Sequence, residues 1–162
     1  MGYICKIFEK HSSVAQWDIC SFLLNSIAHN NIGSKGASSI ADALRVNTSL
    51  VKLNLGKKLN KVVEDNKIEA AGIAEIAAAL KENSTISHFN VAKNQLGNNG
   101  AVAIAKVLEV NKTLDTLNLG ILEALSIADN AIADDGAVSL TKSLEKNSTL
   151  RILNLGNSPH YK

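Results

Sequence analysis

Residue types that could do chemistry are few in this chain, and they stand apart from one another. The histidines show no metal-ligand spacing such as H-x3-H, and no cysteine pair accompanies them; they are His11, His29, His88 and His160. The neighbouring carboxylates Asp134 and Asp135 precede a glycine at an expected helix start, where they would cap free amides. The glycines are too dispersed to form a phosphate-binding loop. The sequence therefore predicts a protein that is not an enzyme and that holds neither a metal nor a cofactor.

Asparagine, whose amide both donates and accepts hydrogen bonds, recurs at fixed places. One column, spaced by 36, 28 and 36 residues, consists of Asn47, Asn83, Asn111 and Asn147. A second column, which fits a tight turn with an internal amide, consists of Asn30, Asn66, Asn94 and Asn130. Glycines with the same spacing as the first column stand at Gly36, Gly72, Gly100 and Gly136. Self-similarity at such a period predicts a stack of similar units.

Each unit combines two periodicities. The apolar residues Ile86, Phe89 and Val91 have the spacing of a strand with one buried face. The residues after Asn94 then repeat at i, i+3, i+4 and i+7, which is one stripe of an α-helix, from Ala101 to Leu108. The columns predict strands at 16–19, 52–55, 88–91, 116–119 and 152–155 and helices at 2–10, 36–46, 71–82, 99–110 and 135–146. The first of these units is a degenerate copy, and the whole chain is expected to form a single domain of about five units.

Composition restricts the classes of partner. Hydrophobic residues make up 46% and charged residues 20%, which is ordinary for one globular body. The net charge of +2 is spread along the chain without a basic tract, so we expect no nucleic-acid ligand. Met1 to Lys10 contains no long apolar run, which argues against a secretory signal or membrane span and favours an intracellular, cytoplasmic location. Cys5 and Cys20 are interpreted as reduced packing residues.

The segment ISHFNVAKNQL, residues 86–96, fits the pattern LxxLxLxxNx[IL], and related segments recur along nearly the whole chain. This pattern resembles the leucine-rich repeats of the ribonuclease-inhibitor-like class. Similar repeats occur in ribonuclease inhibitor, NOD-like receptors, Ran GTPase-activating proteins and tropomodulins. The resemblance implies an α/β solenoid, a horseshoe arc with parallel strands on the concave side and helices on the convex side.

This arrangement predicts which side chains face the concavity. One exposed row, with the usual strand spacing of about 5 Å, would consist of Asp18, Asn54, Asn90, Asn118 and Asn154. A second row beside it would consist of Gln16, Lys52, His88, Thr116 and Ile152. The candidate partner-binding residues are the first row together with Lys52, His88, Thr116 and Lys93. Polar, mostly uncharged rows of this kind would suit the surface of another protein.

Two irregularities interrupt the pattern. Three units carry about eight extra residues after the strand, near 21–28, 57–64 and 121–128, and these are either tolerated loop length or a partner-binding rim. In the last of them, Leu122, Leu125 and Ile127 imitate the strand spacing, but the earlier set from Leu114 to Leu119 is favoured because its columns are apolar in every unit. Neither end of the array has the pattern of a cap, so the chain is a fragment, an array completed by a neighbouring chain, or one that self-associates, and we expect at least one end to be covered.

Three functions follow from the sequence. The first is a non-enzymatic module that binds a protein partner on its concave strand face. The second is a structural subunit of a larger assembly, for which the tropomodulin resemblance suggests the cytoskeleton. The third, favoured least because the arc is short and has no acidic tail, is a GTPase-activating role of the Ran type.

Overall fold

The computed structural model describes the backbone of residues 16–18 and, in full, residues 32–56, 66–119 and 131–155. Strands and helices alternate along these ranges. The strands are β1 (Gln16–Asp18), β2 (Lys52–Asn54), β3 (His88–Asn90), β4 (Thr116–Asn118) and β5 (Ile152–Asn154). The helices are α3 (Gly33–Val46), α4 (Ala70–Glu82), α5 (Gly97–Leu108) and α6 (Asp134–Leu144). The predicted helix 2–10 and the competing strand near 122–127 lie outside the described residues, and the division of the whole chain into about five units in one domain stays a prediction.

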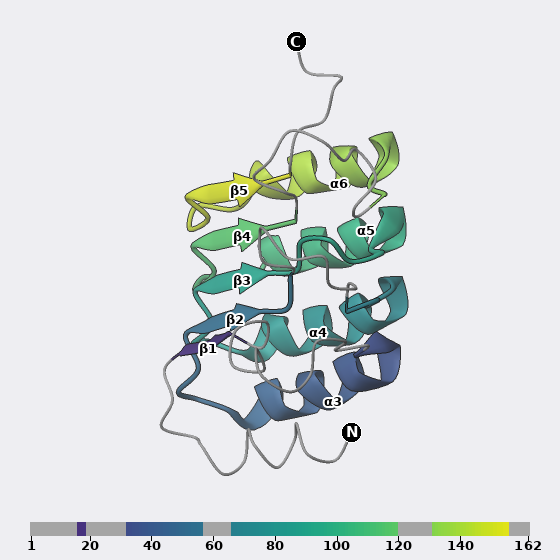
Figure 1. Ribbon diagram of the computed structural model, residues 1–162. Helices are drawn as coiled ribbons and strands as arrows, with labels where there is room; N and C mark the ends of the chain where they lie inside the picture. The colour runs from purple at the N-terminus through teal and green to yellow at the C-terminus, as the bar shows by residue number, and fades with distance from the viewer. Residues whose placement is uncertain (1–15, 19–31, 57–65, 120–130, 156–162) are drawn as a thin grey trace.

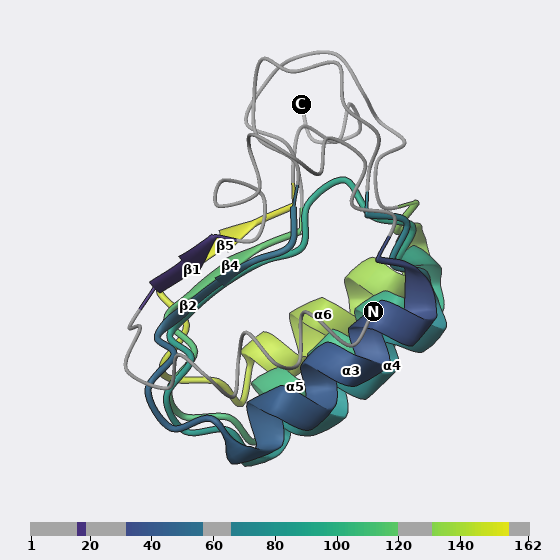
Figure 2. The ribbon, with the colours of Figure 1, turned by 60° about the horizontal axis from the view of Figure 1, so that its bottom comes forward.

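The strands form one parallel sheet in the order β1-β2-β3-β4-β5, and the helices form a second layer beside it (Figures 1 and 2). Each repeat contributes one strand and one helix to the stack. Neighbouring strands lie about 4.8 Å apart and packed helices about 8–10 Å apart, so the stack must bend toward its strands. Figure 1 shows the strands closer together than the helices. The sheet therefore lines the concave side and the helices the convex side, as the sequence predicts.

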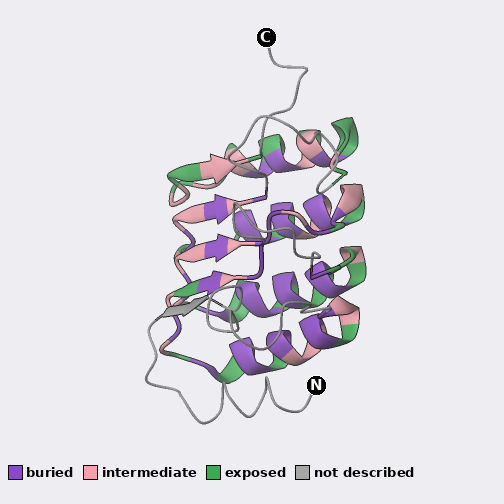
Figure 3. Ribbon diagram, viewed as in Figure 1, coloured by how far each residue is buried: buried purple, intermediate pink, exposed green. Residues whose placement is uncertain are grey.

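The core lies between the two layers (Figure 3). The central strand residues Leu53, Phe89 and Leu117 are at most 1% exposed and lie in register with Leu153 on β5. The apolar stripe predicted for each helix faces these strand residues, and its isoleucines Ile40, Ile76 and Ile104 are fully buried. Small residues allow the layers of neighbouring repeats to approach closely. At Gly72, an added Cβ would lie 2.8 Å from the Cβ of Ala37 on the preceding helix, a distance that real side chains do not adopt.

The first asparagine column ties each repeat to the one before it. The Asn111 side chain accepts hydrogen bonds from the backbone N–H groups of Thr113 (2.9 Å) and Leu114 (2.7 Å) through Oδ1. Its Nδ2 donates to the carbonyls of Leu80 (2.7 Å) and Asn83 (3.2 Å) in the preceding repeat. Asn83 makes the equivalent bonds to Thr85, Ile86, Leu44 and Asn47. Because each amide bridges two repeats, this column fixes the register of the stack.

The second asparagine column lies in turns after the strands, as predicted. Asn94 Nδ2 donates to the carbonyls of Val91 (3.0 Å) and Ala92 (3.3 Å) within its own turn. It also reaches the Leu55 carbonyl of the preceding repeat at 3.2 Å. Asn66 Nδ2 donates to the same carbonyl at 2.7 Å, so the exits of neighbouring strands are joined as well. Asn30 and Asn130 lie outside the described residues.

One expectation for α6 was wrong. No side-chain cap hydrogen bond forms at its start, where Ala133 is the N-cap residue. The Ala133 N–H instead donates to Asn98 Oδ1 of α5 at 2.8 Å, and Asp134 and Asp135 occupy the first turn, where their charges complement the helix dipole. Thr141, which occupies an otherwise buried alanine column, is exposed because no further helix packs against that side of α6 among the described residues.

The last described repeat is less covered than those inside the stack. Leu155 is 47% exposed, whereas Leu55 and Leu119 in the same column are 1% exposed. Leu144, Leu150 and Ile132 are likewise only partly buried. An apolar surface on β5 and α6 therefore faces away from the rest of the described stack.

Candidate functional site

Strand pairing brings the predicted concave residues into two adjacent rows. The register places Lys52 beside His88, His88 beside Thr116 and Thr116 beside Ile152, and the backbone of Gln16 lies next to Lys52. In the same way Asn54, Asn90, Asn118 and Asn154 form a continuous row, which begins at the backbone of Asp18. The side chains of Gln16 and Asp18 lie outside the described residues. The two rows alternate along each strand with buried residues, as a sheet with one solvated face requires.

The asparagine row is half-buried, whereas the sequence predicted an exposed row. Two of its amides, those of Asn54 and Asn90, bend back toward the chain that follows their strands. Asn54 Oδ1 accepts a hydrogen bond from the Gly56 N–H, and Asn90 Oδ1 accepts one from the Ala92 N–H, both at 3.0 Å. A carbonyl oxygen engaged in this way fixes the rotation of the amide group. The amide groups of Asn54 and Asn90 are therefore held in fixed orientations.

Gly56 is adapted to this arrangement. An added Cβ would lie 2.9 Å from the backbone nitrogen of Ala92 and would also overlap the amide oxygen of Asn90. Only glycine leaves room for the neighbouring asparagine and its hydrogen bond. The sequence pattern does not mark Gly56, because the clash depends on a side chain of the next repeat.

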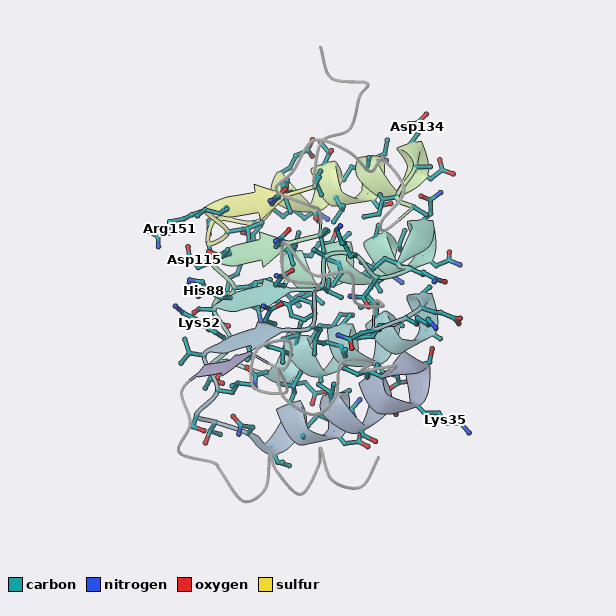
Figure 4. All side chains as sticks on the ribbon, viewed as in Figure 1. Lys35, Lys52, His88, Asp115, Asp134 and Arg151 are labelled. Carbon is teal, nitrogen blue, oxygen red and sulfur yellow. The ribbon has the colours of Figure 1, made fainter. Side chains whose placement is uncertain are left out.

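Charged and titratable side chains gather where the strands begin. Figure 4 shows Lys52, His88, Asp115 and Arg151 one above another at this edge of the sheet. The Arg151 guanidinium binds both carboxylate oxygens of Asp115: its Nε donates to Oδ1, and its Nη2 donates to Oδ2 at 2.9 Å. Ser87 Oγ and His88 Nδ1 share a hydrogen bond of 2.7 Å. This edge places charged side chains beside the asparagine row.

The carboxyl of Asp115 is stabilised in its charged form. Hydrogen bonding to Arg151 is the largest cause that holds the pKa of Asp115 below its usual range, and the charges of Arg151 and His88 act in the same direction. Partial desolvation of the carboxyl opposes these effects. The same pair raises the pKa of Arg151. Asp115 therefore stays ionised at neutral pH and keeps Arg151 in place.

Asp115 and Arg151 were not predicted as site residues. They share a repeat column with Val51 and Ser87, immediately before the strands, where no apolar periodicity marks a position. Their ion pair could have been predicted from the repeat spacing, since these opposite charges lie 36 residues apart and therefore fall on neighbouring strands.

Lys93 does not join the strand rows. It lies in the turn after β3 with a left-handed backbone (φ 57°) and is half-buried. Its candidate role as a partner contact would therefore involve the exit of the strand rather than its concave face.

The described ranges contain no group of three or more His, Cys, Asp or Glu residues arranged to hold a metal ion. Among the same residues, none of the helices combines the length and apolar character needed to cross a membrane.

Comparisons with known proteins agree with this geometry. A family model described as Leucine Rich repeat matches residues 26–41, 82–105 and 122–140. No curated protein is similar to the chain in sequence. Of 48 solved chains with a similar structure, one is described as Leiomodin-1 Actin-Binding Site 2, with a TM-score of 0.68 and 20% sequence identity. The similarity covers 94% of this chain and 76% of that one, and at this identity it establishes the fold alone.

Matching repeats, a parallel sheet with one strand for each repeat, helices on the opposite side and a structural neighbour of the same architecture all lead to one assignment. The chain contains leucine-rich repeats and folds as a leucine-rich repeat solenoid.

Proposed function

We propose that this chain is a non-enzymatic recognition module that binds a protein partner on its concave strand face. The observation that carries the proposal is the asparagine row from Asn54 to Asn154, held in register by strand pairing. The amides of Asn54 and Asn90 already accept hydrogen bonds from the backbone N–H groups two residues further along the chain. They therefore lose little conformational freedom when a partner binds. The ordering cost of association is thereby reduced.

The chemistry of the face favours a polar protein surface. Asn, Thr and His side chains alternate along it, Lys52 and Ile152 are exposed, and the Asp115–Arg151 pair borders it. Interfaces commonly combine such hydrogen-bonding groups with a few apolar and arginine contacts. Lys93 and the backbone position of Asp18 extend the proposed surface at the strand exit and toward β1.

Affinity capture with quantitative mass spectrometry tests this proposal. The bait is the intact chain, and the comparison is the double variant Asn90→Arg with Asn118→Arg, whose bulky charged side chains would fill the concave face. A matched variant, Lys142→Glu, alters the charge of exposed α6 on the convex side. We expect a saturable partner that the concave variant loses and the α6 variant retains. Equal capture by both variants, with both folded, would refute concave binding.

A second candidate is a structural subunit in an actin-containing assembly. Two observations favour it: the fold similarity to a chain described as an actin-binding site, and the apolar surface of β5 and α6 at the exposed Leu155 and the partly buried Leu150. A neighbouring chain or a second copy covering this surface would bury those side chains, each contributing about 1.5–3 kcal/mol if fully buried. An actin-containing partner would also agree with the intracellular location expected from the sequence.

Co-sedimentation with filamentous actin and light scattering after size exclusion test this second candidate. It predicts that the chain either pellets with actin or forms a defined oligomer. A monomer at all concentrations that stays in the supernatant would count against it.

A further inference from the structure

The convex side carries a groove between α4 and α5, which Figure 1 shows as neighbouring helices. Its volume is about 380 Å³. The lining includes Ala74, Ala78 and Lys81 from α4 and Val102, Ala103 and Lys106 from α5. It thus combines a floor of small apolar side chains with two lysines and contains no carboxylate. We call this the α4–α5 groove.

The preceding pair of helices carries ion pairs where the groove carries none. Between α3 and α4, Arg45 lies 2.5 Å from an oxygen of Asp42 and 3.7 Å from an oxygen of Glu75. These side chains link the surfaces of the two helices. Lys81 occupies the column of Arg45, but Ala78 stands in place of Asp42 and Ala103 in place of Glu75. Both carboxylates that would pair with the cation are replaced by alanine.

The following pair of helices is also bridged. Lys146, from the turn after α6, lies 3.2 Å from Glu109, which follows α5. Within the described ranges neither Lys81 nor Lys106 has an ion-pair partner. The α4–α5 groove therefore differs from the contacts on both sides of it in one respect: its positive charge is left without a carboxylate.

We propose that the α4–α5 groove is a second docking site, which takes a short segment of a partner protein with a bulky apolar side chain flanked by carboxylates. The apolar residue would cover Ala74, Ala78 and Ala103, and the carboxylates would take the places that Asp42 and Glu75 fill between α3 and α4. Charge complementarity favours an acidic segment as the occupant, since both charged groups of the lining are lysines. The volume is within the range of grooves that hold small ligands or a few side chains. This site is separate from the proposed concave surface.

A library of displayed random dodecapeptides, selected on the immobilised chain, tests the proposal. Selected peptides are expected to carry Asp or Glu on both sides of Leu, Phe or Trp. Their synthetic versions should bind Ala103→Glu at least about tenfold more weakly, because the new carboxylate fills the groove and pairs with Lys81. Lys81→Glu should weaken binding similarly through like-charge repulsion.

Two matched controls keep the result specific. Ser139→Glu introduces the same residue into the same repeat column on α6 and should leave peptide binding unchanged. Asn90→Arg, which blocks the concave face, should also leave peptide binding unchanged. The groove proposal and the concave-face proposal are thereby tested independently. Circular dichroism confirms that each variant is folded.

Three outcomes would overturn the proposal. One is that no peptide is enriched over the bare support, and another is that enriched peptides lack carboxylates or bind Ala103→Glu as tightly as the unaltered chain. The third is that phosphatidylserine vesicles bind the unaltered chain but not Lys81→Glu while no peptide does, which would assign the lysines to a lipid surface.

Discussion

Truncation of Asn111 to alanine is expected to lower the free energy of unfolding by about 4 kcal/mol. The side chain is 5% exposed and bridges two repeats, with Nδ2 2.7 Å from the Leu80 carbonyl and Oδ1 2.7 Å from the Leu114 nitrogen. Alanine would leave that carbonyl and that N–H buried without partners. Each unsatisfied buried group costs about 1–3 kcal/mol, so two of them give about 2–6 kcal/mol.

Urea unfolding followed by circular dichroism measures the effect. With a denaturant slope of about 2 kcal/mol per molar, the midpoint should fall by about 2 M. Asn99→Ala is the matched control: it removes an exposed asparagine from α5, for which a change within about 0.5 kcal/mol is expected. Midpoints that shift equally in the two variants would refute the reasoning that the buried amide joins the repeats.

Three further predictions concern other parts of the stack. Gly56→Ala should cost about 1–3 kcal/mol in urea unfolding and displace Asn90, since the new methyl group cannot fit; an unchanged midpoint would contradict this. Phe89→Ala, which empties a site 1% exposed, should cost about 3–5 kcal/mol, whereas a loss below about 1 kcal/mol would argue against its central position. Asp115→Asn should destabilise at pH 7 but not at low pH. Because folding lowers the pKa of Asp115, its contribution is complete above the unfolded value of about 3.9 and disappears as pH falls through the lower folded value; a difference that persists at pH 2 would be inconsistent.

The fold could be predicted from the sequence because repeat columns report burial. Leu53, Phe89 and Leu117 each stand at the same place in their units, and packing requires them to align on adjacent strands. Helix boundaries were less accessible. Helix α5 begins at Gly97 and ends at Leu108, whereas the sequence predicted 99–110. The first turn carries no apolar residue that could mark where the helix begins.

The candidate surface was only partly accessible to the same reasoning. Alternation along the strands predicted which face of the sheet Asn90 and His88 occupy. It did not predict that the Asn90 side chain accepts a hydrogen bond from the Ala92 N–H, because the repeat pattern does not depend on how an amide group is rotated. Side chains that meet across repeats, such as Asp115 with Arg151, depend on which columns face one another. The α4–α5 groove was missed for the same reason: alanine at positions 78 and 103 is informative only beside the charged residues of the neighbouring helices.

Site-specific photo-crosslinking tests concave binding most directly. A benzoylphenylalanine placed at Ile152 reports on the concave face, and one at Val138 reports on α6; these apolar side chains are 57% and 49% exposed in the same repeat. Binding on the strand face predicts that irradiation in a cell lysate joins a single protein to the chain through position 152 and not through position 138. A partner captured through position 138 alone, with both variants folded, would contradict it.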